Sequence, residues 1–184
     1  SLFPTKYVLR LGTTYKINWS TLSRNPKCNR FLKANPKNID WGWLSCNPNA
    51  IKLLKANFGK IDWYNLSKNP NTEAIELLKA YPKKIKWEYL SENSNTNIIE
   101  LLKEKIKLEN NLSSDELDDL LIIKKDWSVL SANPIVIELL KANQGKINWQ
   151  ALSANPNAFE LLKKYPKKKD WEYTSMNPVI FEAK

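Results

Sequence analysis

Few side chains in this 184-residue chain could act as catalysts or metal ligands. Histidine is absent, which removes the commonest general base and the commonest metal ligand. The two cysteines, Cys28 and Cys46, lie in separate segments with no histidine that could activate a thiolate. The four glycines are isolated from one another, so no glycine-rich phosphate loop occurs. We therefore expect no enzymatic activity, no metal and no cofactor.

One dense acidic cluster lies in the sequence SSDELDD and contains Asp115, Glu116, Asp118 and Asp119. In a helix, Asp115 and Asp119 would lie one turn apart and could face a cation, but calcium takes six or more oxygen ligands. A helix start explains the residues better, with Ser113 reaching forward and Glu116 reaching back at an N-terminus that favours negative charge. Docking to a basic partner surface stays open as an alternative.

Tryptophan recurs at a fixed spacing. Segments of 22 residues that begin at Trp19, Trp41, Trp127 and Trp149 share the pattern WxxLSxNPxxxxLLKxNxxKID with small departures, and Trp63 begins a version with two extra residues. Eight units result, opening at Trp19, Trp41, Trp63, Trp87, Glu109, Trp127, Trp149 and Trp171. Residues 109–126 form a degenerate unit, four residues shorter and without its tryptophan, and residues 1–18 form a divergent half-unit or cap.

Within a unit, the sequence predicts two short helices. Asp40, like Asp62, stands just before a tryptophan, where a carboxylate can cap a first helix of about two turns. Asn47 and Pro48 then give a second start, because proline is tolerated at the first helical position. The second helix ends at an asparagine such as Asn35, which we expect in the left-handed conformation.

One such pair buries too little apolar surface to offset the entropy of ordering its backbone, so neighbouring pairs must stack. The predicted fold class is therefore all-α, an α-solenoid of about eight short helix-pair repeats in a single elongated domain over residues 19–184. The degenerate unit should have the thinnest packing in it.

The phrase WLSxNPNAIxLLKxNPxKIDW closely resembles short tandem helical repeats found in many uncharacterised proteins of large amoebal and algal DNA viruses, the mimivirus-like group. The resemblance extends from Trp19 to Pro178. It implies a helical-repeat fold and a viral, intracellular origin, in the host cytoplasm, the viral factory or the virion. It carries over no catalytic or binding residues. Heavy use of asparagine, lysine and isoleucine, which AT-rich genomes favour, fits that origin.

Aromatic residues divide into two sets. Tryptophan three residues before a fixed leucine is typical of a buried ladder, so we assign the structural core to Trp19, Trp41, Trp63, Trp87, Trp127, Trp149 and Trp171. Base stacking on these rings is the alternative that this assignment disfavours. Slots that hold an aromatic residue in some units and a small one in others are candidates for partner binding, namely Trp43, Tyr64, Tyr89 and Tyr173.

Lysine gives the chain a net charge of +10. Many lysines fall between a second helix and the next tryptophan, so stacking would gather a basic edge of Lys37, Lys60, Lys83, Lys84, Lys146, Lys167, Lys168 and Lys169. Such an edge could follow a phosphate backbone, or it could simply be a solvated surface.

The leading hypothesis is a non-enzymatic scaffold that binds a viral or host protein. A nucleic-acid or polyanion binder and a structural component of the virion are the alternatives. No run of residues is long and apolar enough for a membrane span, and two unpaired cysteines favour a reducing compartment.

Overall fold

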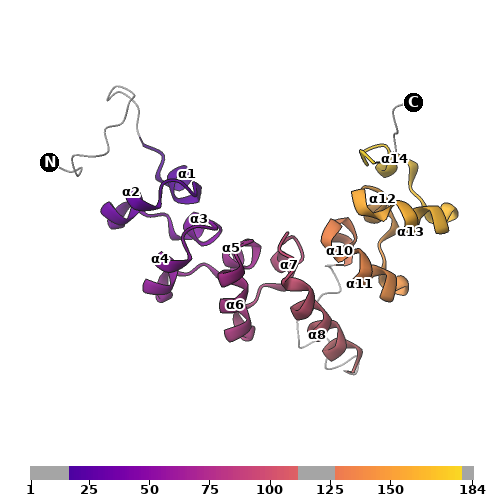
Figure 1. Ribbon diagram of the computed structural model, residues 1–184, viewed down its shortest axis with the longest axis horizontal. Helices are drawn as coiled ribbons and strands as arrows, with labels where there is room; N and C mark the ends of the chain where they lie inside the picture. The colour runs from indigo at the N-terminus through magenta and orange to yellow at the C-terminus, as the bar shows by residue number, and fades with distance from the viewer. Residues whose placement is uncertain (1–16, 112–126, 180–184) are drawn as a thin grey trace. The chain divides into compact units, whose positions relative to one another are not determined.

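The structure, a computed structural model, describes residues 17–111 and 127–179, and every regular element within those ranges is a helix. Short helices pack in neighbouring pairs, which confirms the predicted all-α repeat solenoid (Figure 1). The contacts divide the chain into two compact units, unit 1 (Ser1–Ile85) and unit 2 (Lys86–Lys184), where the sequence predicts one elongated domain. The predicted N-terminal half-unit, apart from residues 17 and 18, and the acidic cluster lie outside the described residues.

The described part of unit 1 contains helix pairs that alternate between two layers. The first helices are α1 (Trp19–Arg24), α3 (Trp41–Ser45) and α5 (Trp63–Lys68), and the second helices are α2 (Asn29–Ala34), α4 (Ile51–Ala56) and α6 (Thr72–Ala80). A short 3-10 helix follows each pair, at η1 (Pro36–Asn38), η2 (Phe58–Lys60) and η3 (Pro82–Lys84). α1 packs on α3 and α3 on α5, so the first helices form one layer and the second helices the other (Figure 1).

The described part of unit 2 repeats this arrangement. Its first helices are α7 (Trp87–Leu90), α10 (Trp127–Ala132), α12 (Trp149–Ser153) and α14 (Trp171–Thr174), and its second helices are α8 (Ile98–Asn110), α11 (Ile137–Ala142) and α13 (Phe159–Lys164). The 3-10 helices η4 (Pro134–Val136) and η6 (Pro156–Ala158) precede second helices, whereas η5 (Gln144–Lys146) and η7 (Pro166–Lys168) follow them. α10 packs on α12 and α12 on α14. We call each helix pair a rung and name it by its first residue.

Side chains of the repeat cap both helices of a rung. Asp62 accepts a hydrogen bond from the Asn65 N–H at 2.8 Å, and each repeat tryptophan is the first residue of its helix. At the end of the second helix, the expected left-handed asparagine is wrong, since no described residue has a positive φ and Asn35 lies at φ −130°. Its side-chain amide instead donates to the Phe31 carbonyl at 2.9 Å, which satisfies a carbonyl that the helix leaves open.

Buried asparagines form a polar ladder between rungs, although the equivalent residue of rung Trp19, Asn25, is exposed. Asn47 is fully buried, and its amide nitrogen donates to the backbone carbonyls of Ser23 at 2.9 Å and Asn25 at 3.1 Å in the preceding rung. The same pair of bonds is made by Asn69 to Ser45 and Asn47, by Asn155 to Ser131 and Asn133, and by Asn177 to Ser153 and Asn155. The asparagine therefore fixes the register of stacking, because both carbonyls must align with one amide group.

A buried serine links the rungs in the other direction. The Ser45 hydroxyl donates to the Trp41 carbonyl at 2.7 Å and accepts the Asp62 N–H of the next rung at 3.0 Å. Equivalent hydroxyls are those of Ser131, which accepts from Asn148, and Ser153, which accepts from Asp170. The repeated Leu-Ser-x-Asn sequence thus supplies a leucine to the core and two polar groups to the joint between rungs.

Replacing Ser45 by alanine should lower the free energy of unfolding by about 1 to 2 kcal/mol, because the Asp62 N–H loses its acceptor at a partly buried position. Urea unfolding followed by tryptophan fluorescence measures the change. Ser128 is exposed on α10, so Ser128→Ala is the control and should have little effect. Equal effects of the two substitutions would contradict this role for the serine.

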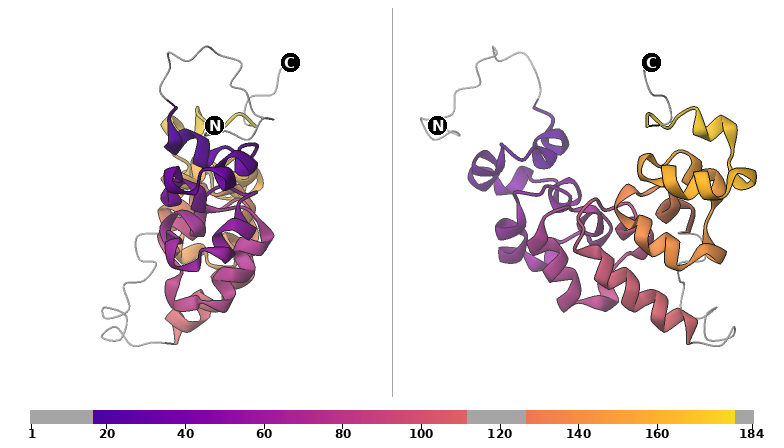
Figure 2. Two further views of the ribbon diagram at one scale, coloured as in Figure 1. Left: turned by 90° about the vertical axis from the view of Figure 1, so that its left-hand side faces the viewer. Right: turned by 45° about the vertical axis from the view of Figure 1, so that its right-hand side comes forward.

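The predicted opening of a unit at Glu109 needs correction. Glu109 lies inside α8, which has 13 residues where α4, α11 and α13 have six (Figure 2). The other second helices end at an asparagine or a tyrosine, whereas this segment reads Lys103-Glu104-Lys105-Ile106 and has no stop signal there. Ile98, Leu102 and Ile106 are buried on one face and extend the helix. Residues 112–126 of that unit lie outside the described residues.

Candidate partner-binding surface

The repeat tryptophans are not the buried core that the sequence predicts. The core consists of aliphatic residues such as Leu44, Leu54 and Leu66, which are fully buried. The repeat tryptophans are half-buried, except Trp171, which is 71% exposed. Some of these rings contact an aromatic side chain of their own rung: Trp19 stacks on Phe31 with ring centroids 5.6 Å apart, and Trp149 meets Tyr165 at 5.2 Å.

Lysines lie over some of these rings. The Lys146 ammonium is 5.5 Å from the centroid of Trp127, and the Lys168 ammonium is 5.6 Å from that of Trp149. Both lysines come from the 3-10 helix that closes the same rung, η5 and η7. A cation at this distance from a ring face is attracted by the ring's electron density. The tryptophan edge and the predicted basic edge are therefore one surface in unit 2.

The four predicted partner-binding residues fall into two groups. Trp43 on α3 is exposed, with the Arg24 guanidinium 5.2 Å from its ring centroid, and Tyr64 on α5 is 50% exposed. Tyr89 on α7 and Tyr173 on α14 are half-buried. Trp43 and Tyr64 therefore present ring surface to a partner, whereas the other two present less.

Sequence reasoning missed an aromatic cluster in unit 1, formed by Phe58, Trp63 and Tyr81. The Phe58 ring centroid lies 5.6 Å from that of Trp63 and 4.9 Å from that of Tyr81, and the Trp63 and Tyr81 centroids are 5.8 Å apart. Phe58 opens η2, Trp63 opens α5, and Tyr81 joins α6 to η3. Phe58 is 41% exposed and Tyr81 43% exposed, so rungs Trp41 and Trp63 together present an apolar patch.

A signal for this cluster is present in the repeat. The slot of Phe58 holds Pro36 in the rung before it and Gln144 in rung Trp127, and the slot of Tyr81 holds Asn57 and Asn143 in other rungs. Two neighbouring departures from the pattern, both toward a large aromatic residue in a connection, mark the site. Recognising them requires knowing that the two connections lie side by side, which the ring distances establish.

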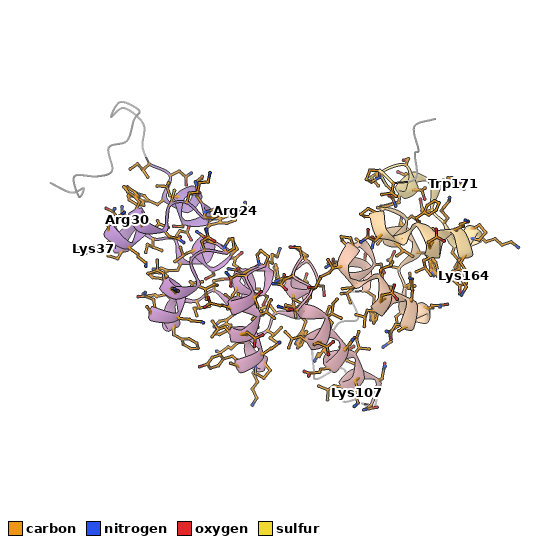
Figure 3. The ribbon with its side chains drawn as sticks, viewed as in Figure 1. Arg24, Arg30, Lys37, Lys107, Lys164 and Trp171 are labelled. Carbon is orange, nitrogen blue, oxygen red and sulfur yellow. The ribbon has the colours of Figure 1, made fainter. Side chains whose placement is uncertain are left out.

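We use the term connection lysines for the predicted basic edge of Lys37, Lys60, Lys83, Lys84, Lys146, Lys167, Lys168 and Lys169. All are exposed except the half-buried Lys169, and Figure 3 shows the Lys37 side chain extending away from the ribbon. Within residues 17–111 and 127–179 they form no ion pair. The lysines of the second helices differ, because four pair with glutamates, as in Lys55–Glu73 and Lys141–Glu138. The connection lysines therefore retain their charge for an external anion.

Unit 2 also has a mostly apolar groove of about 640 Å³ between α8 and α11. Ile99 and Ile106 on α8 and Leu139 on α11 line it, and Lys103 and Lys107 stand on its rim. α8 has 13 residues and α11 has six, and residues along both helices line the groove.

Three described side chains, those of Cys46, Glu73 and Lys105, have shifted pKa values, and burial or a hydrogen bond explains each shift. Burial raises the pKa of the Cys46 thiol, against the opposing charge of Arg24, so the reactive thiolate is disfavoured. Burial lowers the pKa of the Lys105 ammonium, against the charge of Glu109, and the ammonium lies 5.2 Å from the Trp87 ring centroid. A hydrogen bond from Lys55 lowers the pKa of Glu73.

Three further indicators of function are clusters of metal ligands, membrane-spanning helices and similarity to known proteins. In the described residues, no three cysteine, aspartate or glutamate side chains converge on a point where a metal ion could be held. No helix in those ranges is long and apolar enough to cross a membrane. Comparison with protein-family models, with curated proteins and with solved structures finds no match to this chain.

Proposed function

We propose that this protein is a non-enzymatic helical-repeat scaffold that binds another protein. One observation carries the proposal, the aromatic cluster of Phe58, Trp63 and Tyr81 on the surface of unit 1. Rings of this kind are enriched at binding hot spots, because they bury a large apolar area at a small cost in side-chain entropy. A viral or host protein is the partner that the repeat resemblance suggests.

Within each rung, the residues that join neighbouring rungs differ from those that vary on the surface, and this difference supports the proposed function. The Leu-Ser-x-Asn residues build the joint between rungs and are nearly the same in every rung, so they specify the scaffold. The connection slots do not contribute to the ladder and differ between rungs, so substitutions there change the surface without changing the fold. Repeat scaffolds gain partner specificity in this way.

The aromatic double variant Phe58→Gln/Tyr81→Asn tests the proposal. Each new residue is the one that another rung carries in the same slot, so the fold should be retained. The asparagine at position 81 should even cap α6, as Asn57 caps α4 by donating to the Leu53 carbonyl at 2.9 Å. Binding of the partner should weaken by at least about 2 kcal/mol, since truncation of a single hot-spot residue costs about 2 kcal/mol or more.

The measurement is quantitative capture on the immobilised protein from extracts of the cells that express it, followed by titration of the captured protein. Phe159→Asn is the matched control, because Phe159 is an exposed aromatic residue outside the cluster and Asn29 holds its slot in rung Trp19. If the double variant has an unchanged melting temperature and still captures the partner, the aromatic cluster is not the binding site.

A second candidate function is polyanion binding through the connection lysines, and their freedom from ion pairs in the described residues favours it. Binding of this kind is strongest at low salt, because it releases counterions from the phosphates. A heparin column at about 50 mM salt tests it. Passage of the protein without retention would eliminate this candidate and leave the scaffold.

A further inference from the structure

We infer that the aromatic cluster and the lysines beside it form one docking site for an acidic peptide segment of the partner, with a bulky apolar side chain at its centre. The inference rests on the proposed function and names the chemistry of the partner. The lysines are Lys60 in η2 and Lys83 and Lys84 in η3, the same connections that hold Phe58 and Tyr81.

The charge of the site is positive and uncompensated. Lys60, Lys83 and Lys84 are exposed and form no ion pair with any described residue. The carboxylate between the two connections, Asp62, is engaged by the Asn65 N–H at 2.8 Å as the cap of α5. An apolar centre with cations on its rim complements a peptide whose apolar side chain is flanked by aspartate or glutamate.

The ring geometry favours a peptide over single-stranded nucleic acid. Bases stack on open ring faces, as successive parallel layers. Phe58 and Trp63 meet edge to face at 72°, and Tyr81 is tilted by 50° and 57° to its two neighbours. The three rings are therefore inclined to one another and offer no parallel platform. An aliphatic or aromatic side chain, which packs against edges and faces alike, fits such a cluster better.

In unit 2 the residues that occupy the same slots form a hydrogen bond with each other, so unit 1 is the expected site. The Tyr165 hydroxyl and the Gln144 amide oxygen form a hydrogen bond of 2.7 Å where unit 1 has the apolar contact of Tyr81 with Phe58. Lys168 lies over the Trp149 ring, whereas in unit 1 the faces near Trp63 are occupied by Phe58 and Tyr81. Lys60 and Lys84 thus keep their charges for a ligand.

Fluorescence anisotropy with three labelled probes tests the inference on the full chain at about 50 mM salt. The first probe is a peptide of about 12 residues with a central Leu-Phe pair flanked by aspartate and glutamate, a length that spans the patch. The second replaces the acidic residues by asparagine and glutamine, and the third is an oligothymidylate of similar length. The acidic peptide should bind at least about tenfold more tightly than either of the others.

Two variants locate the site. The aromatic double variant and Lys60→Asn/Lys84→Asn should each weaken binding of the acidic peptide at least about tenfold. The asparagine is the residue that rung Trp19 carries at the lysine slot, as Asn38. Lys146→Asn/Lys168→Asn makes the same change in unit 2 and should alter the affinity less than about twofold.

Other results would overturn the inference in distinguishable ways. If the amide peptide bound as tightly as the acidic peptide, the partner segment would not need to be acidic. If the oligothymidylate bound more tightly than both peptides, the surface would be assigned to nucleic acid. Failure of all three probes, with capture of a native partner still dependent on Phe58 and Tyr81, would reject the acidic peptide and leave the scaffold function standing. Failure of both the probes and the capture would reject the two proposals together.

Discussion

Replacing Asn47 by alanine is expected to lower the free energy of unfolding by about 3 to 5 kcal/mol. The side chain is fully buried, donates to the Ser23 and Asn25 carbonyls and accepts the Asn49 N–H at 3.0 Å. Alanine leaves the Ser23 carbonyl and the Asn49 N–H without this partner, while the Asn25 carbonyl keeps only the Cys28 N–H. Each unsatisfied buried group costs about 1 to 3 kcal/mol.

Aspartate at the same position separates hydrogen bonding from packing. Asn47→Asp keeps the shape of the side chain but turns an acceptor oxygen toward two carbonyl oxygens, so at pH 7 it should destabilise the fold at least as much as alanine. Protonation of that carboxyl group would restore one donor, so part of the loss should be recovered in acid. Urea unfolding at pH 7 and at about pH 4 measures both effects.

The control lies two residues away. Asn49 is exposed and its amide donates to the Pro26 carbonyl at 3.2 Å, so Asn49→Ala should cost less than about 1 kcal/mol. A loss at Asn47 no greater than the loss at Asn49 would mean that the ladder does not hold the rungs together.

The ladder also explains how much of the fold could be predicted from the sequence. Spacing alone gave the helix pair, because Asp40 caps α3 and Trp41 opens it, and the all-α solenoid followed from stacking such pairs. The role of Asn47 was predicted as a local cap, yet its amide bonds reach residues 22 and 24 positions earlier. A cap and a ladder require the same residue type, so sequence cannot distinguish them.

The tryptophans were misassigned for a related reason. A strict period marks a residue as structurally important, but it does not say which part of the side chain is buried. Trp63 opens α5, and its indole contacts both Phe58 of the preceding rung and Tyr81 of its own, so it belongs to both the scaffold and the candidate site. Which part of the indole is buried depends on the distances between neighbouring connections. Those distances are set by the register in which units stack, so the sequence of a single unit does not show them.

The partner-binding candidates show the same limit. Variation among units correctly pointed to exposed slots at Trp43 and Tyr64, which lie on first helices. The cluster of Phe58 and Tyr81 required comparing two adjacent units at once, because its residues come from consecutive connections. The sequence also could not show which lysines are free of ion pairs. Lysines of the second helices pair with glutamates of those helices, whereas the connection lysines do not in the part of the chain that the structure describes, and only the structure shows this difference.

Asn133 gives the second large prediction, because it shows which rungs of unit 2 are neighbours. Its amide nitrogen donates to the carbonyls of Ser91 at 2.7 Å and Asn93 at 3.1 Å, residues 42 and 40 positions earlier, where the other described ladder bonds span 24 and 22. Rung Trp127 therefore stacks directly on rung Trp87. The ladder bonds of rung Trp127 thus reach a rung that precedes the predicted degenerate unit of residues 109–126 in the sequence.

Asn133→Ala should consequently destabilise unit 2 by about 3 kcal/mol, as should Asn155→Ala one rung later, because each removes an amide that donates to two carbonyls of the preceding rung and accepts one N–H. Hydrogen exchange measured by mass spectrometry locates the damage: protection should fall in residues 87–93 as well as in 127–139. Asn157→Ala, at an exposed residue, is the control. Loss of protection confined to residues 127–139 would contradict direct stacking, since the carbonyls released by the substitution belong to Ser91 and Asn93.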